Sequence, residues 1–264
     1  MFGLIGTGNM GSALARALCR GVGPERLLLC NRTEEKARAL ARELGCAVGD
    51  SQTLASFCRY LLLGVKPQGM AALLAELRPI LQSSRPVLVS MAAGLTLEQL
   101  EALSGGDLPI LRIIPNTPVA VGSGVILYCK NALLTEEEER VLVQALSPAG
   151  LLEPLEEGLM DVGSALCGCS PAFTDLYLEA LADGAVACGI PRDKALRFAA
   201  AAVAGAARLA LESGSHPGVL KDSVCSPGGS TIQGVRLLEN RAFRGAVMDA
   251  VITAAGASGD LGRR

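Results

Sequence analysis

Residues 221–234, Lys-Asp-Ser-Val-Cys-Ser-Pro-Gly-Gly-Ser-Thr-Ile-Gln-Gly, interrupt an alanine-rich C-terminal half with small and polar side chains. Small residues ahead of a helix leave its first backbone N–H groups accessible, and such groups capture a carboxylate or a phosphate. The alternative is an ordinary helix start, with Ser226 as N-cap and Pro227 at the first helical position. Taken alone this segment favours the helix start, so the anion site depends on the rest of the chain.

A glycine-rich turn near the N-terminus indicates a second anion site. The apolar residues 2–5 predict a strand, Gly6, Gly8 and Gly11 follow with Gly-x-Gly-x-x-Gly spacing, and the amphipathic run 12–20 predicts a helix. Glycines allow a tight turn and a close approach of the backbone to a pyrophosphate at the helix N-terminus. The spacing alone is a weak signal, but the strand–turn–helix context favours a dinucleotide site over an incidental turn.

The end of the second expected strand bears on the choice of cofactor. Residues 27–30 are apolar, and Asn31 and Arg32 follow where an NAD-preferring site usually has an acidic residue for the ribose hydroxyl. A guanidinium can pair bidentately with a 2′-phosphate, which an acid would repel. We expect NADPH, with NADH as the alternative; a solvated arginine at a strand end is the competing interpretation.

Composition excludes several classes of function. A net charge of −2 without a basic cluster argues against a nucleic-acid partner. The most apolar run, 195–211, carries Arg197 and Arg208 and is too short and too charged to span a membrane. The nine scattered cysteines and the single His216 predict reduced thiols and no metal site. Without a signal-peptide pattern, we expect a cytoplasmic protein with no membrane partner.

The pattern of elements predicts two domains. Strands expected at 60–65, 86–90, 110–114 and 124–129 alternate with helices, which is typical of an α/β fold: a doubly wound, mostly parallel sheet of Rossmann type over residues 1–157. Over 158–264 only helices are expected, at 172–188, 192–212, 231–240 and 243–261. Residues 199–207 are nearly all small, so this helix should be surrounded. So short a helical domain cannot surround it alone, which predicts a homodimer through an all-α dimerisation domain.

With these motifs in order, the chain resembles the pyrroline-5-carboxylate reductase family over essentially its whole length. The resemblance is carried by residues 5–11 and 221–231, by Val65-Lys66-Pro67, by Ser-Met-Ala-Ala-Gly at 90–94, and by Ile-Pro-Asn-Thr-Pro at 114–118. It implies an NAD(P)H-dependent oxidoreductase that reduces the C=N bond of 1-pyrroline-5-carboxylate to give L-proline, the last step of proline biosynthesis.

The resemblance also implies site residues. The substrate would be held by Gly228, Gly229, Ser230 and Thr231, with the catalytic Thr231 hydroxyl near the ring nitrogen, and this segment of one subunit would meet the cofactor cleft of a dimer-related site. An oligomer larger than the dimer is left open. The implied cofactor-binding residues are Gly6, Thr7, Gly8, Asn9, Met10 and Gly11 for the pyrophosphate, Asn31, Arg32 and Ser51 for the adenosine side, and Val65, Lys66, Pro67, Ala92, Ala93 and Asn116 for the nicotinamide side.

The implied chemistry agrees with the residue types. A substrate bound as its protonated iminium needs no protein acid at the hydride step, so positioning and carboxylate capture suffice. Two alternatives are left open: a reductase of another small cyclic imine or keto acid, and a catalytically weakened dinucleotide-binding protein.

One departure from the family's pattern supports the weakened protein. The family's Ser-Gly-Ser-Gly-Pro-Ala is Cys-Gly-Cys-Ser-Pro-Ala at 167–172. Ser170 then either stores strain at a positive φ and crowds the substrate, or lies in the β region and caps a helix that Pro171 begins.

Overall fold

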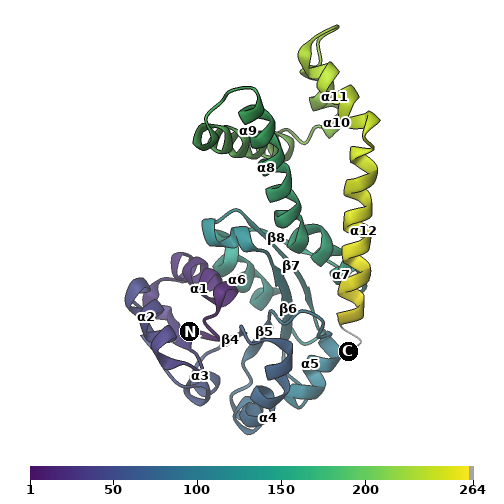
Figure 1. Ribbon diagram of the computed structural model, residues 1–264. Coiled ribbons are helices and arrows are strands. Elements are labelled where there is room, and N and C mark those ends of the chain that lie inside the picture. Colours follow the sequence, from purple (N-terminus) through teal and green to yellow (C-terminus); the bar gives the residue numbers. More distant parts are fainter. Residues whose placement is uncertain (262–264) are drawn as a thin grey trace. The chain divides into compact units, whose positions relative to one another are not determined.

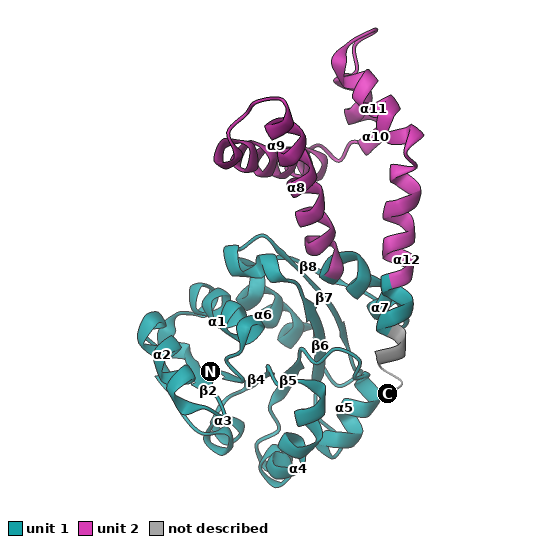
Figure 2. Cartoon of the chain, viewed as in Figure 1, with its two compact units in different colours: residues 1–168, 254–264 teal, residues 169–253 magenta. Residues whose placement is uncertain are grey.

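The computed structural model describes residues 1–261, which form two compact units (Figures 1 and 2). Unit 1 comprises residues 1–168 and the described residues from 254 onward, and unit 2 comprises residues 169–253. The chain therefore leaves unit 1 once and returns to it. The boundary after residue 157 that the loss of strand patterns suggested stays a prediction.

Unit 1 is built on one eight-stranded sheet with the order β3-β2-β1-β4-β5-β6-β7-β8. Every neighbouring pair is parallel except β6 and β7, which are antiparallel. The direction of strand order reverses at β1, between β2 and β4, and ligands of such sheets bind at the carboxyl ends of the strands at this switch point. The predicted doubly wound, mostly parallel sheet is confirmed. The strands are β1 Phe2–Ile5, β2 Leu27–Cys30, β3 Ala47–Val48, β4 Tyr60–Leu63, β5 Val87–Ser90, β6 Ile110–Pro115, β7 Gly124–Lys130 and β8 Gly150–Pro154.

Helices cover both faces of this sheet (Figure 1). Helices α1 (Asn9–Val22), α2 (Glu34–Leu44) and α6 (Glu136–Leu146) bury their apolar sides with one set of strand residues. Helices α3 (Ser51–Phe57), α4 (Pro67–Ser84) and α5 (Leu97–Ser104) bury theirs with the alternate set. Burying a leucine side chain contributes about 1.5–3 kcal/mol, so these two cores hold the strand ends in fixed register.

Local sequence signals set where several helices begin. Thr96 accepts from the Gln99 N–H at 3.2 Å while the Gln99 side chain accepts from the Thr96 N–H at 2.9 Å, and Thr135 and Glu138 form the same reciprocal pair. The sequences Thr-Leu-Glu-Gln at 96–99 and Thr-Glu-Glu-Glu at 135–138 predict capping boxes, and the structure confirms both. They satisfy backbone donors that a helix start leaves open.

Unit 2 contains helices and, within residues 169–253, no strand. In α9 only Ala195 and Ala199 are buried, and residues 200–206 are exposed except for half-buried Val203. The helix that we expected to be surrounded is thus not covered by its own chain. None of the helices that the structure describes is long and apolar enough to cross a membrane. The helices of this part are α8 Ser170–Ala187, α9 Arg192–Ser213, α10 Pro217–Ser223, α11 Ser230–Asn240 and α12 Phe243–Leu261, and α12 continues into unit 1.

Among the elements not predicted from the sequence are β3, α3, β8 and α10. Strand β3 has two residues, and the edge strand β8 ends at Pro154 and leaves Leu151 half exposed, so neither shows an alternating apolar pattern. Strand β4 ends at Leu63 rather than Val65, although Gly64 still donates its N–H to Ile5 O of β1 at 2.7 Å.

Candidate active site

The glycine-rich turn follows β1 at the switch point of the sheet. Gly6 has φ +105°, and a Cβ there would lie 2.4 Å from Gly64 O. A Cβ on Gly11 would lie 1.9 Å from Gly6 O, whereas one on Gly8 would meet nothing within 4 Å. The chain's own packing therefore requires glycine at positions 6 and 11. Gly8 instead leaves open space in which a pyrophosphate can approach the protein backbone.

The N-terminus of α1 fits an anion. Gly8 is its N-cap, no side chain caps it, and its first turn contains no acidic residue. The Thr7 N–H is held by Asn31 Oδ1 at 3.0 Å, and the buried Thr7 Oγ1 has no hydrogen-bond partner in the described part of the chain. Open backbone donors and an orphaned hydroxyl beside them are what a bound phosphate oxygen would satisfy. Asn31, predicted to face the ribose, holds the turn in place.

Arg32 presents its charge on the predicted adenosine side. Arg32 is exposed and forms no ion pair within residues 1–261, and the nearby Glu34 pairs with Arg38 at 2.6 Å. Ser51 begins α3 behind its N-cap Asp50 and donates to Glu76 Oε1 at 3.5 Å.

Sequence reasoning missed two carboxylates on this side. Burial raises the pKa of the Cys30 thiol at the end of β2, and the charges of Asp50 and Glu76 raise it further. Backbone and side-chain hydrogen bonds from Thr53 hold the pKa of Asp50 below its usual value, so Asp50 is ionised. Asp50 follows β3 and Glu76 lies on α4, and both elements are far in sequence from the glycine-rich turn.

Two further loops follow the adjacent strands β4 and β5. Lys66 is exposed and is the N-cap of α4, and Pro67 occupies its first position. Ala92 is 2% exposed and donates its N–H to Ser90 Oγ at 3.3 Å, while Ala93 is exposed. Because β1, β4 and β5 are parallel neighbours, the loop of Val65, Lys66 and Pro67 and the loop of Ala92 and Ala93 lie at the same edge as the glycine turn.

Asn116 follows β6 and is 7% exposed. Its Oδ1 accepts from Val125 N at 2.8 Å, and its Nδ2 donates to Cys167 O at 3.0 Å. In an α-helix the Cys167 carbonyl would accept a hydrogen bond from the N–H of the residue four positions later. That residue is Pro171, which has no N–H. The Asn116 amide therefore satisfies this carbonyl and ties β6 to the segment that leads into unit 2.

The Ser-Pro-Gly-Gly segment forms a turn rather than a helix cap. Gly229 N donates to Ser226 O at 3.0 Å and Gly228 has φ +71°, the features of a type II turn with Pro227 at its second position. Helix α11 begins at Ser230 with Gly229 as N-cap, and no side chain caps it. The prediction of Ser226 as N-cap is therefore wrong, because the positive φ of Gly228 keeps the chain in a turn.

Thr231 lies exposed in the first turn of α11, beside the open backbone donors of that helix. The predicted substrate residues Gly228 to Thr231 thus gather at one helix start in unit 2, and the predicted cofactor residues gather in unit 1. The structure describes each group by itself. Over residues 1–261, no three His, Cys, Asp or Glu side chains gather in a way that could hold a metal ion.

Two family profiles and several relatives match the chain. Residues 157–261 match the profile described as pyrroline-5-carboxylate reductase dimerisation, and residues 1–94 match that described as NADP oxidoreductase, coenzyme F420-dependent. The pyrroline-5-carboxylate reductase of Escherichia coli (strain K12) is 40% identical over 252 residues, which is 94% of this chain and 93% of the relative. This chain belongs to the pyrroline-5-carboxylate reductase family. The resemblance noted from the motifs is therefore confirmed.

Other members of the pyrroline-5-carboxylate reductase family support the assignment. The enzyme of that name from Pisum sativum is 38% identical and covers 98% of this chain and 95% of its own. The structure of a pyrroline-5-carboxylate reductase from Coxiella burnetii superposes with a TM-score of 0.93 at 28% identity, covering 98% of this chain and 97% of that one. A Plasmodium falciparum pyrroline carboxylate reductase with NADP bound gives 0.85 at 29% identity, with 99% and 97% covered.

The departure from the pyrroline-5-carboxylate reductase pattern at 167–170 takes neither expected form. Ser164–Cys169 is a π-helix that runs from α7 (Met160–Gly163) directly into α8, so Ser170 is helical. The φ of Ser170 is not positive. Ser170 is also not an N-cap in the β region, because the residue before it, Cys169, is already helical with φ −93° and ψ −27°. Both predictions for Ser170 are wrong: the wider helical turn and the Asn116 bond let the chain pass Pro171 without a break.

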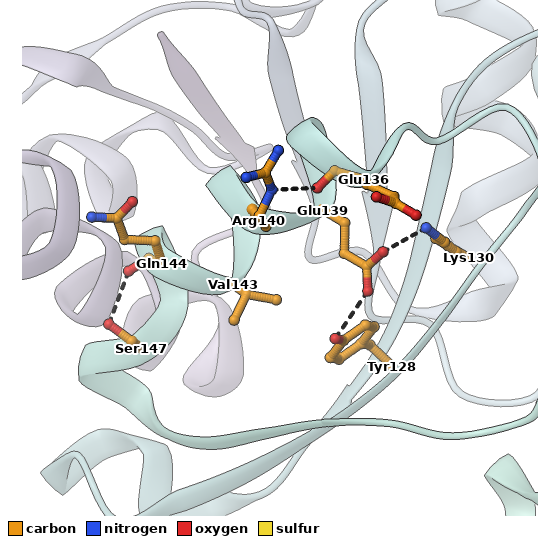
Figure 3. A pocket seen from close by; sticks show the side chains of 8 residues that line it. All are labelled: Tyr128, Lys130, Glu136, Glu139, Arg140, Val143, Gln144 and Ser147. Carbon is orange, nitrogen blue, oxygen red and sulfur yellow. Dashed lines mark hydrogen bonds and ion pairs between the residues drawn. The ribbon is translucent and has the colours of Figure 1, made fainter.

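A surface depression of about 590 Å³ between β7 and α6 contains none of the predicted family site residues (Figure 3). Within it Glu139 accepts from Tyr128 Oη at 3.0 Å and from Lys130 Nζ at 2.5 Å. Burial, with help from Glu139, raises the pKa of Tyr128 to about 12, so this phenol stays protonated.

Proposed function

We propose that this protein is an NADPH-dependent pyrroline-5-carboxylate reductase that transfers a hydride to the C=N bond of 1-pyrroline-5-carboxylate and forms L-proline. One observation carries the proposal: each unit presents a helix N-terminus without a side-chain cap or an acid in its first turn, α1 behind the glycine turn and α11 behind the Pro227–Gly228 turn. The first suits the cofactor's pyrophosphate and the second the substrate's carboxylate. The family relatives over the full length support the same reaction.

The cofactor is assigned to the residues at the strand ends of unit 1. The backbone of residues 6–11 and Thr7 Oγ1 hold the pyrophosphate, Arg32 pairs with the 2′-phosphate, and Ser51 faces the adenosine. Val65, Lys66 and Pro67, with Ala92 and Ala93, line the nicotinamide side. Asn116 acts beneath the reacting centre through its bonds to Val125 and Cys167. When bound, the cofactor supplies the hydride.

The residues of α11 hold and orient the imine. The open N–H groups of the first turn bind the substrate carboxylate, an attraction of about 0.3–1 kcal/mol when exposed and up to about 2 kcal/mol when partly buried. The Thr231 hydroxyl contacts the ring nitrogen and fixes the face presented to the hydride. The nitrogen enters already protonated as the iminium, so no general acid is needed at that step.

Two copies of the chain make up the active form in this proposal. The family profile over 157–261 is one of dimerisation, and the small-residue face of α9 is exposed in the single chain. One subunit then supplies α11 to the cofactor cleft of a dimer-related site. An assembly larger than a dimer is left unassigned. A cytoplasmic location is part of the proposal, and cell fractionation with immunodetection tests it.

The deciding experiment mixes the purified protein with NADPH and pyrroline-5-carboxylate, follows cofactor oxidation, and identifies L-proline by chromatography. Proline formed in step with NADPH oxidised is the expected result. Turnover of other cyclic imines or keto acids but not of pyrroline-5-carboxylate would show that the proposed substrate is wrong. Tight NADPH binding without any turnover would show that the protein binds the cofactor but is not an enzyme.

A further inference from the structure

Arg112 lies on β6 with a side chain that is only 4% exposed. Its Nη1 donates to Glu157 Oε1 at 3.0 Å, and its Nη2 lies 3.8 Å from Asp161 Oδ1. Glu157 begins a 3₁₀ turn, Glu157–Leu159, that leads into α7. The pair therefore connects the middle of the sheet to the segment that runs on into unit 2.

The same carboxylate oxygen has a second bond. Glu157 Oε1 accepts from Leu97 N at 2.7 Å, and Leu97 is the first residue of α5. A carboxylate at a helix N-terminus satisfies an open donor and fits the helix dipole. Arg112 thus acts on the start of α5 through one intermediate, Glu157.

Stability alone does not account for this arrangement. Burying the Arg112 charge costs solvation that offsets its attraction to Glu157, whose side chain is 34% exposed, so the ion pair is weak evidence for net stability. Arg112 Nε is also buried without a hydrogen-bond partner among the described residues. The pair instead holds one segment of the chain in place.

The segment that it holds is the loop 91–96 between β5 and α5. The loop starts from two fixed bonds, Met91 N to Leu63 O at 3.4 Å and Ala92 N to Ser90 Oγ at 3.3 Å. It turns at Gly94, with φ +80°, and ends at Leu97 on the Glu157 carboxylate. The exposed Ala93 lies between these two anchors, so moving the Leu97 end changes where Ala93 lies.

We propose that Arg112 is a positioning residue: through Glu157 and Leu97 it fixes the loop of Ala92 and Ala93 against which the nicotinamide ring is set for hydride transfer. This inference rests on the proposed function. The phosphate contacts assigned to residues 6–11 and to Arg32 do not involve Arg112 or the loop 91–96, so its loss affects the hydride step more than it affects cofactor affinity.

The test uses the full-length protein and its variants Arg112→Met, Arg112→Lys and Glu157→Gln. Leu142→Ala is the control for lost stability, because Leu142 is fully buried on α6 in the core on the sheet face opposite α5. Four quantities are measured: the NADPH dissociation constant, kcat, the isotope effect on kcat with NADPH deuterated at the transferred position, and amide exchange of a peptide covering 91–99.

Arg112→Met should lower kcat by about 10- to 100-fold, since misplacing a reacting group by about 1 Å can cost that much. The isotope effect should rise, exchange over 91–99 should increase, and NADPH affinity should change less than about threefold. Arg112→Lys, which can keep one bond to Glu157, should recover part of kcat. Should Arg112→Met not fold, Arg112→Lys and Glu157→Gln carry the test with the same directions and smaller changes.

The inference is overturned if these variants lose kcat no more than Leu142→Ala, if the isotope effect stays unchanged, or if NADPH affinity falls in parallel with kcat. Absence of turnover in the unmodified protein would instead refute the proposed function. In that case amide exchange over 91–99 still decides whether Arg112 holds the loop.

Discussion

At the scale of single residues, the structure separates side chains that hold the site from side chains left available for ligands. Asn31 and Asn116 were both predicted to bind the cofactor, but the side-chain amides of both form hydrogen bonds to backbone groups of the protein. Arg32, which follows β2, and Thr231, in the first turn of α11, are exposed. These two are therefore the residues whose substitution should most directly alter ligand recognition.

Replacing Arg32 with glutamate should weaken the use of NADPH selectively. A charge-assisted hydrogen bond is worth about 1.5–3 kcal/mol, so kcat/KM with NADPH should fall by about 10- to 100-fold. With NADH, which has no 2′-phosphate, the change should stay within about threefold. Steady-state kinetics with both cofactors measure this, and Arg42→Glu, the same charge change on α2, is the control. Equal losses with both cofactors would remove Arg32 from the phosphate site.

Replacing Thr231 with alanine should impair the imine and spare the cofactor. Loss of one hydroxyl contact in the site should raise KM for pyrroline-5-carboxylate or lower kcat by roughly 10-fold, which corresponds to about 1.4 kcal/mol. Thr231→Ser keeps the hydroxyl and should keep most of the activity. Calorimetric titration with NADPH should give the same dissociation constant for all three proteins. A weakened NADPH affinity would show that the two half-sites are assigned the wrong way round.

Ser170 offers a test of the helical connector. Because Ser170 is helical, stability should follow helix propensity, with alanine highest, serine about 0.5 kcal/mol below it and glycine lower by about another 0.5 kcal/mol. Urea unfolding of the wild-type protein and of Ser170→Ala and Ser170→Gly gives the order. The reverse order, with glycine most stable, would mean a positive φ at this position after all.

At the scale of elements, the sequence predicted best where one local pattern determines the structure. Glycine spacing after an apolar run specified the β1–α1 turn, and the Thr96 and Thr135 capping boxes specified two helix starts. The π-helix Ser164–Cys169 could not be predicted, because it depends on an amide from Asn116, 51 residues earlier. The sequence left the alternative of a Ser226 cap open at the Ser-Pro-Gly-Gly segment, since a cap and a turn use the same residue types and differ in the φ of Gly228.

The α11–α12 junction contains a strained residue. Ala242 has φ +54°, a left-handed conformation that costs a residue with a Cβ about 1–2 kcal/mol. Ala242→Gly should therefore raise the free energy of unfolding by about 1 kcal/mol. Ala39→Gly, at an exposed position inside α2, should instead lower it by about 1 kcal/mol. Denaturant titrations of both variants compare the two signs, and a loss at Ala242 would contradict the strain.

At the scale of the whole molecule, the helical unit leaves many large apolar side chains exposed. One chain does not bury them, and exposed apolar surface of this extent marks an interaction site. This is also why the substrate half of the proposed site could be assigned from the sequence only by resemblance: no local pattern encodes which subunit of the proposed dimer would supply α11. The exposed residues include Leu176, Leu181, Phe198, Leu209, Leu211, Leu237, Val247, Met248 and Ile252.

The active protein should be a dimer in solution. Light scattering at micromolar concentration should give at least twice the 27.1 kDa of one chain. Leu209→Asp, a charge on the exposed side of α9, should shift the protein to monomers and abolish turnover together. Phe57→Asp, at an exposed apolar residue of unit 1, should leave the assembly intact. A fully active monomer would end the proposal of a shared site.

The return of the chain to unit 1 at residue 254 has a consequence for proteolysis. Unit 2 is an insertion with two covalent connections, one at 168 and one at 253. A single nick in the turn at 226–229 therefore produces two fragments, each of which still carries part of unit 1. Such a nicked chain would show two bands after denaturation and yet elute as one species under native conditions.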